Sequence, residues 1–167
     1  MVAIALDVHM LMDDPFVEVI KHFEGFFPKV YKCPAGKWTI GYGHLTSSHH
    51  APVTEKEAEQ LLKEDLVEAY FDLKRNAPFM VEDEDIEPCK AMALISWIFN
   101  LGVGNFRSST LLKRLKARKW DEAAQEILRW DKCTNPATGR KETLRGLTRR
   151  RKSESHYFQT GEAKVFD

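Results

Sequence analysis

The pattern of apolar residues changes at Glu24-Gly25, and this change restricts the chain to a fold that joins a helix to a small sheet. Before it, Asp14-Pro15 opens an amphipathic run with helical spacing, and proline suits the first position of a helix. After it, residues 29–44 contain a Cys-Pro-Ala-Gly turn signal followed by a two-residue alternation. An acid therefore ends a helix beside a strand pattern, which predicts a cleft with a proton donor on one wall.

Helical patterns dominate the rest of the chain. Thr54-Glu55-Lys56-Glu57 forms a capping box that opens a long helix over residues 55–76. Pro88 opens a run that is apolar almost all round and closes at Gly102, which predicts a buried central helix. Shorter helices are expected at about residues 109–117, 121–130 and 147–158, with a loop over residues 132–146.

These elements predict an α+β fold that is mainly α, with a small N-terminal β-hairpin lobe and a larger helical lobe. The long helix joins the lobes, and the cleft lies between them. A chain of 167 residues, 43% of them hydrophobic, has room for one such core. We expect one domain over residues 1–167, made of an N-terminal extension (1–13), the first helix with the β lobe (14–54), the connecting helix (55–76) and the helical lobe (88–160).

Composition argues against several classes of protein. Three cysteines are an odd number in a chain of this size, so a disulfide framework is not expected and a reducing compartment suits the chain. The longest apolar stretch is far shorter than the ~18 residues of a membrane span. The N-terminus lacks the features of a signal peptide. The chain has no heptad seam that would suggest association, so we expect a monomer. Because its apolar stretches are short, we expect no stable membrane insertion.

Charge is distributed unevenly along the chain. Residues 1–88 carry 17 acids and 8 bases, whereas residues 89–167 carry 8 acids and 17 bases. The basic half either attracts a polyanion or balances the acidic half within the molecule. No nucleic-acid-binding motif surrounds the basic residues near the C-terminus, and no cluster has metal-ligand spacing, so we expect neither nucleic acid nor metal as a partner.

Glu24 is the first candidate for chemistry. It stands at the inner end of a short helix with Phe23, Phe26 and Phe27 beside it in sequence. Apolar surroundings disfavour a carboxylate and favour the acid form, which can donate a proton near neutral pH. The alternative is an ordinary exposed glutamate at a helix end.

Cys33 and Thr39 are the next candidates. In a turn beside Lys32, the Cys33 thiol could be partly ionised and hold a water molecule, or it could be a small apolar filler. Thr39 lies on the opposite strand face from Trp38 and Ile40 in our reading, which would direct it to the cleft, although strand propensity alone also explains a threonine there.

His44 and Asp65 form an expected structural pair near the site. Asp65 is four residues after Leu61 and four before Ala69, so it falls on the apolar stripe of the long helix. A buried aspartate needs a partner, and His44 at the end of the hairpin is placed to supply it. We expect this pair to fasten the β lobe to the long helix rather than to take part in catalysis.

Together these residues resemble the catalytic signature of phage-type lysozymes, the endolysins of glycoside hydrolase family 24. The signature comprises Glu24, Cys33 and Thr39 with the run Thr-Ile-Gly-Tyr-Gly-His over residues 39–44. The likeness extends from about residue 14 to 158 and includes the helix starting near Val53, the run over residues 94–106 with Ser109-Thr110-Leu111, and Gly146-Leu147 with Arg149, Arg150 and Glu154.

The resemblance implies a lysozyme-like fold and a muramidase that cuts the β-1,4 bond between N-acetylmuramic acid and N-acetylglucosamine in peptidoglycan, without a cofactor. Glu24 would protonate the leaving oxygen and Thr39 would orient the attacking water. Cys33 stands where many members carry aspartate, which departs from a two-carboxylate scheme. We favour a role for Cys33 in water positioning or as a base, with inversion at the sugar carbon. Arg149 or Arg150 is expected to contact Glu24.

The resemblance also bears on location and on rival functions. Residues 1–13 do not resemble the apolar anchor of some relatives, so we expect accumulation in the host cytoplasm and access to the wall through a separate pore protein. One rival is a peptidoglycan peptidase or amidase using Cys33 and His44, although a hairpin offers no helix N-terminus to activate the thiol. The other rival is an inactive wall-binding module, which the presence of Glu24 and Thr39 disfavours.

Overall fold

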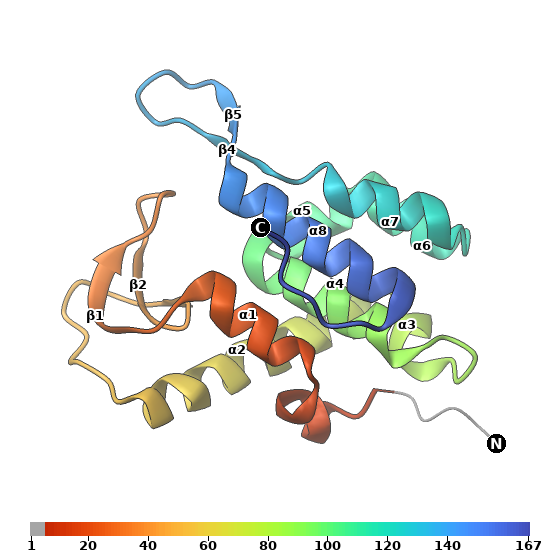
Figure 1. Cartoon of the computed structure of the whole chain (residues 1–167), viewed down its shortest axis with the longest axis horizontal. Helices are drawn as coiled ribbons and strands as arrows, with labels where there is room; N and C mark the ends of the chain where they lie inside the picture. The colour runs from red at the N-terminus through yellow and green to blue at the C-terminus, as the bar shows by residue number, and fades with distance from the viewer. Residues whose placement is uncertain (1–5) are drawn as a thin grey trace.

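The computed structural model describes residues 6–167 (Figure 1). The helices are η1 (Val8–Asp13), α1 (Phe16–Glu24), α2 (Glu55–Asn76), α3 (Phe79–Glu82), α4 (Pro88–Leu101), α5 (Val103–Ser108), α6 (Thr110–Lys116), α7 (Trp120–Leu128) and α8 (Arg145–Thr160). The strands are β1 (Phe27–Lys32), β2 (Trp38–Gly41), β3 (His44–Leu45), β4 (Lys132–Thr134) and β5 (Lys141–Thr143). The predicted α+β, mainly helical architecture is confirmed.

The β lobe is a three-stranded antiparallel sheet in the order β1-β2-β3. The sequence predicted a hairpin, and the structure adds β3, which pairs Ile40 with His44 and Thr39 with Leu45. The turn between β2 and β3 requires positive φ at Gly41 and Gly43, a conformation that glycine adopts readily. This turn brings the end of the sheet back to the C-terminal end of α1.

Helix α2 joins the two lobes. Its capping box is present: the Thr54 hydroxyl accepts from the Glu57 amide at 3.1 Å, and the Glu57 carboxylate accepts from the Thr54 amide at 3.2 Å. One face of α2 packs against β2 and β3 and also against α4 (Figure 1). The apolar stripe that the sequence predicted is buried at Ala58, Leu62, Leu66, Ala69, Tyr70 and Leu73.

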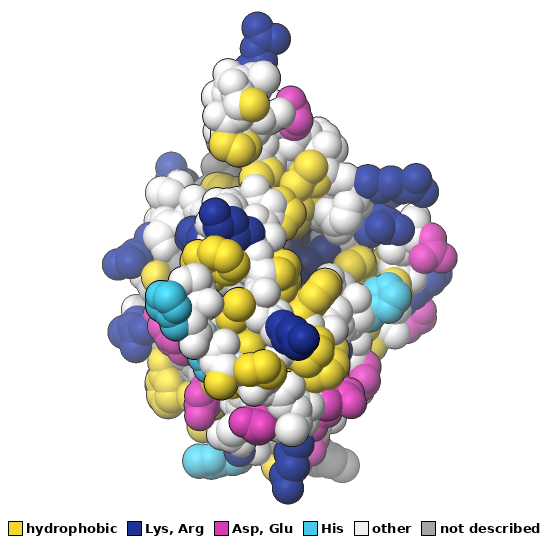
Figure 2. All heavy atoms as spheres, turned by 90° about the vertical axis from the view of Figure 1, so that its left-hand side faces the viewer, with side chains coloured by type: hydrophobic (Ala, Val, Ile, Leu, Met, Phe, Trp, Pro, Cys, Tyr) yellow, Lys and Arg dark blue, Asp and Glu magenta, His cyan; other side chains and the backbone are white. Residues whose placement is uncertain are grey.

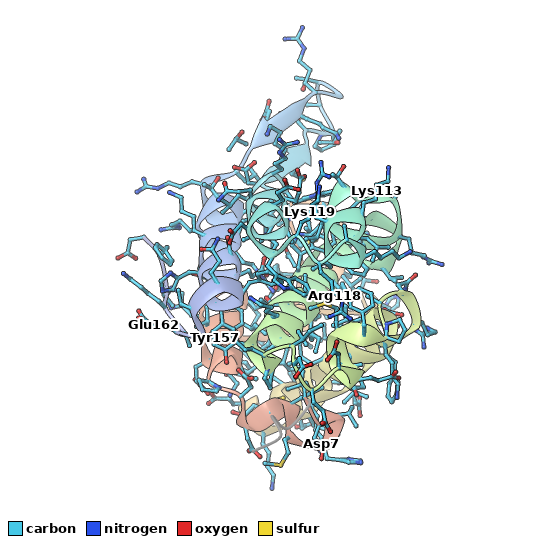
Figure 3. The ribbon with its side chains drawn as sticks, turned by 90° about the vertical axis from the view of Figure 1, so that its right-hand side faces the viewer. Asp7, Lys113, Arg118, Lys119, Tyr157 and Glu162 are labelled. Atoms are coloured by element: carbon cyan, nitrogen blue, oxygen red, sulfur yellow. The ribbon has the colours of Figure 1, made fainter. Side chains whose placement is uncertain are left out.

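Helix α4 is the centre of the helical lobe. Residues 91–98 are buried without interruption, and Trp97 packs edge-on against Phe106 and Trp130. The helix packs against α2 on one side and α8 on another. On the face away from the sheet, Arg118 forms an ion pair of 2.8 Å with Asp83, which joins the end of α6 to the segment after α3 (Figure 3).

Two segments differ from the sequence reading. Part of the expected extension forms η1, and its Leu11 is 1% exposed within the core, whereas residues 1–5 lie outside the described part of the chain. The expected loop over residues 132–146 contains the hairpin β4–β5 (Figure 1). Most of its strand residues are exposed, so the hairpin carries no alternation that the sequence could reveal. Within residues 6–167, no helix is long and apolar enough to cross a membrane.

Candidate active site

Glu24 ends α1 and faces Arg150 of α8. Gly25 follows with a φ of +70° and terminates the helix, so the glutamate side chain projects beyond the last turn. Its carboxylate forms an ion pair with the Arg150 guanidinium, and the two side chains are only 15% and 5% exposed. The last helix therefore supplies a buried cation directly at the proposed acid.

The expectation of apolar surroundings for Glu24 needs correction. Phe26 and Phe27 are 36% and 41% exposed, and their rings pack against Tyr42 and Tyr31 respectively. The group in contact with the carboxylate is a guanidinium, because α8 crosses close to the end of α1. The alternative reading, an ordinary exposed glutamate, is also wrong.

Cys33 and Thr39 come together at the β1–β2 turn. Cys33 donates its amide to Lys37 O at 2.9 Å, and the Thr39 hydroxyl donates to the same oxygen at 3.1 Å. Partial burial opposes ionisation of the thiol, but hydrogen bonds from the backbone of Lys37 and Ala35 and from the Thr39 hydroxyl prevail and lower the pKa of Cys33. The thiol is therefore set up for partial ionisation.

Tyr31 connects the two halves of the site electrostatically. Burial raises the pKa of Tyr31, and the negative charges of Glu24 and Cys33 raise it further. Glu24 and Cys33 thus both lie within electrostatic range of one β1 residue. Thr39 is 3% exposed and is not among the residues that line the cavities around Glu24 and His44, so its direction toward the cleft stays a prediction.

His44 and Asp65 are in contact, as their spacing suggested. His44 Nδ1 lies 2.9 Å from Asp65 Oδ2, and this bond joins β3 to α2. Both side chains are partly buried, at 25% and 19% exposure. A cysteine peptidase would also need His44 to contact the Cys33 thiol, and within residues 6–167 no hydrogen bond joins these two side chains.

Two cavities lie between the lobes, and Gly43 of the second is next to Glu24 of the first. The first, of about 370 Å³, is lined by Glu24, Arg149 and Arg150 together with residues of β1–β2, α1, α4, the start of α8 and the C-terminal segment. The second, of about 360 Å³, is lined by Gly43, His44, Asp65 and residues of α4 and α5. These cavities form a cleft between the lobes. Figure 2 faces the β-lobe side, where exposed hydrophobic side chains gather; those of the lobe itself are Phe26, Phe27, Trp38 and Leu45.

The sequence alone did not single out several residues of the site. Spacing could not distinguish Arg149 from Arg150, and the structure shows that Arg150 contacts Glu24 while Arg149 lines the first cavity. Gly43 was seen only as part of a strand alternation, yet a Cβ built on it would collide with the Glu24 carboxylate. Ser96 and Glu154 form hydrogen bonds behind Arg150. Glu154 had appeared only as part of the family resemblance, and a serine in the apolar α4 run was a further signal for this buried cluster.

The chain is similar to known proteins in sequence and in fold. The family model described as phage lysozyme matches residues 21–154. An endolysin of Acyrthosiphon pisum secondary endosymbiont phage 1 is 34% identical over 145 residues, covering 85% of this chain and 93% of that protein. The endolysin of Bacillus phage B103 is 38% identical over 152 residues; the match covers 89% of this chain but only 54% of that longer protein.

Solved structures show the same likeness. The muramidase domain of SpmX from Asticaccaulis excentricus has a TM-score of 0.75 at 33% identity, covering 87% of this chain and 95% of that one. The endolysin from Escherichia coli O157:H7 phage FAHEc1 has a TM-score of 0.75 at 27% identity, covering 89% and 93%. The family model spans most of the chain, including the described site. The chain belongs to the phage lysozyme family.

Proposed function

We propose that Glu24 is the general acid with which this phage lysozyme, an endolysin-type muramidase, hydrolyses the glycan strands of bacterial peptidoglycan. The observation that carries the proposal is the position of Glu24 in the wall of the first cavity, in contact with a buried arginine. A sugar linkage in the cleft would present its bridging oxygen to this carboxyl group. The bond would be the β-1,4 linkage between N-acetylmuramic acid and N-acetylglucosamine.

Proton donation defines the first half of the reaction. Glu24 gives its proton to the bridging oxygen while the bond from that oxygen to the sugar carbon breaks, so the leaving sugar departs as a neutral alcohol. Glu24 is then a carboxylate facing Arg150, which stabilises the new negative charge. The guanidinium thus stabilises the Glu24 carboxylate that proton transfer leaves behind.

Cys33 and Thr39 act in the second half of the reaction, the attack of water. Positive charge develops on the sugar carbon, and a water molecule attacks it and loses a proton. The lowered pKa of Cys33 supports a thiolate that accepts this proton, and the Thr39 hydroxyl, hydrogen-bonded at the same turn, orients the water. Attack on the face opposite the leaving group inverts the sugar carbon. His44 and Asp65 keep β3 on α2 and thereby keep the cleft in shape.

The cellular setting follows from the same activity. The protein acts on the cell wall from inside the host, and we propose that it accumulates in the cytoplasm as a monomer and reaches the wall after a separate protein permeabilises the membrane. Support comes from the phage origin of its relatives. Some relatives of this chain are named SAR-endolysins, so endolysins of more than one named class are similar to it.

Digestion of purified peptidoglycan tests the proposal. Wild type, Glu24→Gln, Cys33→Ser and Cys33→Asp are compared, with Glu18→Gln as a matched control because Glu18 is on the same helix and its side chain is 79% exposed. We expect new reducing ends with wild type and Glu18→Gln, near-complete loss with Glu24→Gln, and retained activity with Cys33→Asp. Full activity in Glu24→Gln would overturn the assignment. New amino groups without reducing ends would indicate a peptidase, and binding without products a wall-binding module.

A further inference from the structure

A buried charge cluster surrounds the guanidinium of Arg150, and apart from Arg150 its members have no part in the reaction scheme proposed above. Its members are Arg150, Arg151 and Glu154 of α8, which are 4%, 0% and 0% exposed. Glu154 stands three and four residues after the arginines, so all three side chains share one face of the helix. Ser96 of α4 completes the cluster from the opposite side and is also 0% exposed.

Glu154 is the centre of this cluster. Its Oε2 accepts hydrogen bonds from Ser96 Oγ at 2.5 Å, from Arg151 Nη2 at 3.0 Å and from Arg150 Nε at 3.4 Å. Its Oε1 lies 2.6 Å from Arg151 Nε in an ion pair without hydrogen-bond alignment. One carboxylate therefore contacts both guanidinium groups and a hydroxyl.

Arg150 is consequently held along several edges of its planar group. Nη1 donates to Glu24, Nε donates to Glu154, and Nη2 donates to Ser96 O at 3.5 Å and Ser96 Oγ at 3.4 Å. The fixed geometry of a guanidinium converts such contacts into a defined orientation. The direction in which Arg150 meets Glu24 is thus set by Glu154 and Ser96.

The balance of charges around Arg150 depends on whether Glu24 is ionised or protonated. With Glu24 ionised, two carboxylates face two guanidinium groups. A general acid must carry a proton before it acts, and Glu154 is then the anion that still faces both arginines. Buried ion clusters bring little stability over apolar packing of the same volume, so packing alone gives a weak reason for these four residues.

We propose that Glu154 is a positioning residue for the hydrolase reaction: with Ser96 it fixes the orientation of Arg150 and shares the charge of that arginine, so that Glu24 retains its proton until transfer. This role rests on the assignment of Glu24 as the acid. Without Glu154, the whole attraction of Arg150 would fall on Glu24 and favour its ionised form.

Other groups near Glu24 set the background for this effect. His22 from α1 and Arg149 from α8 line the same cavity, and Tyr31 of β1 and Arg151 of α8 are within electrostatic range of the carboxylate. The backbone of Gly43 covers the remaining side. Of these groups, only Arg151 changes in the variants below: Arg151→Met/Glu154→Gln keeps the net charge of the cluster, whereas Arg151→Met/Glu154→Asp makes it one unit more negative.

The variants are chosen to keep the fold intact. Glu154→Gln alone would leave Arg151 buried without its carboxylate, a change that costs about 3–5 kcal/mol. The double variant Arg151→Met/Glu154→Gln removes one charge of each sign, and Ser96→Ala removes only a hydroxyl. Arg151→Met/Glu154→Asp restores the carboxylate. Arg118→Met/Asp83→Asn removes an ion pair of opposite charges far from the cleft and serves as the matched control.

The readouts are kcat, KM, the pH dependence of kcat on peptidoglycan, and thermal unfolding. We expect Arg151→Met/Glu154→Gln to lower kcat about tenfold with little change in KM, and to move the alkaline limb of the profile to lower pH. Ser96→Ala should lower kcat a few-fold in the same direction. The Asp rescue should return the limb toward its wild-type position, and the control should match wild type throughout.

The outcomes separate this role from a structural one and from the assignment of Glu24. A merely structural role predicts a lower unfolding temperature with an unchanged alkaline limb, and that result would overturn the proposal. If the double variant does not fold, Ser96→Ala decides, and wild-type kcat with a wild-type limb would overturn it. Activity in Glu24→Gln would instead refute the acid itself, whereas an inactive Glu24→Gln beside a normal double variant would refute only the role of Glu154.

Discussion

Gly43 packs its backbone directly against the carboxylate of Glu24. A Cβ built on Gly43 would lie 2.7 Å from Glu24 Cδ, closer than real side-chain contacts allow. The glycine also has a φ of +78°, so the turn between β2 and β3 needs it for conformation as well as for space. The sheet therefore forms one wall of the carboxylate site, and Arg150 forms another.

We predict that Gly43→Ala damages catalysis more than stability. The methyl group must push Glu24 away from its place beside Arg150, and a displacement near 1 Å at a catalytic group costs roughly 100-fold in rate. The strained φ should add about 1–2 kcal/mol of destabilisation. Reducing-end release gives kcat, and urea denaturation gives the free energy of unfolding.

Gly139→Ala is the matched control for backbone strain. Gly139 has a φ of +70° in the β4–β5 hairpin, and a Cβ there would meet no atom within 4 Å. Its stability cost should resemble the strain part of the Gly43 change, while kcat should stay at the wild-type value. Equal kcat values in the two variants would show that Gly43 does not define the position of Glu24.

Cys33 should control the acidic limb of the pH profile if its thiolate is the base. Burial opposes ionisation, but hydrogen bonds from Lys37, Ala35 and Thr39 lower the pKa of the thiol. Activity should therefore rise as pH increases through this lowered pKa. In Cys33→Asp the limb should move several pH units down, toward the ordinary carboxyl pKa of about 3.9.

The measurement is kcat/KM across the pH range on peptidoglycan fragments, with Cys89→Ser as a control thiol at the start of α4. Cys89→Ser should reproduce the wild-type profile. Cys33→Ser should lose most activity at every pH, because an alcohol does not ionise in this range. An acidic limb that stays in place in Cys33→Asp would exclude the base role and leave water positioning as the function of this residue.

The sequence predicted the elements whose patterns are strong. The capping box at Thr54, the apolar α4 run and the alternation at Trp38–Gly43 each combine several local signals, and each corresponds to an element of the structure. The hairpin β4–β5 could not be predicted, because its exposed strands are held by pairing with each other and carry no buried face.

The residues of the candidate site likewise fall into those that the sequence could predict and those that it could not. His44 and Asp65 could be paired in advance because helical period placed an aspartate on an apolar stripe. Arg150 and Glu154 could not be assigned, because their roles depend on how α8 crosses α1 and α4, which no local pattern specifies. The same long-range crossing explains why Glu24 meets a guanidinium where its neighbours in sequence suggested only rings.

The His44–Asp65 bond should contribute measurably to stability. It joins β3 to α2 through partly buried side chains, a setting in which coupled residues interact by about 0.5–3 kcal/mol. A double-mutant cycle with His44→Gln and Asp65→Asn, followed by urea denaturation at pH 7, should give a coupling of about 1–2 kcal/mol. His50→Gln is the control, because the His50 side chain bonds only the backbone of its neighbour Ala51 in the described structure. Coupling near zero for His44 would remove its fastening role.

Tyr42 makes a second connection between the sheet and α2, and its effect should depend on pH. Its hydroxyl donates to Glu55 Oε1 at 2.8 Å, and burial together with the Glu55 carboxylate raises the pKa of Tyr42 to about 12. The unfolded chain would release this proton near pH 10. The folded state thus binds the proton more tightly, and stability from Tyr42 is fully present below pH 10 and lost as pH rises toward 12.

Tyr42→Phe should therefore destabilise the protein by about 1 kcal/mol at pH 7, the usual value of such a hydrogen bond. The difference between wild type and variant should shrink as pH rises above 10, because only wild type loses this contribution there. Urea denaturation at pH 7 and at steps up to pH 11 measures the trend. Glu55→Gln keeps an acceptor but removes the charge, so ultraviolet titration of the tyrosines should show one group ionising at lower pH than in wild type. The free energies of unfolding of wild type and Tyr42→Phe could instead differ by the same amount at every pH. That result would mean that packing holds the hydroxyl at the sheet–helix junction, and that the Glu55 carboxylate does not stabilise its protonated form.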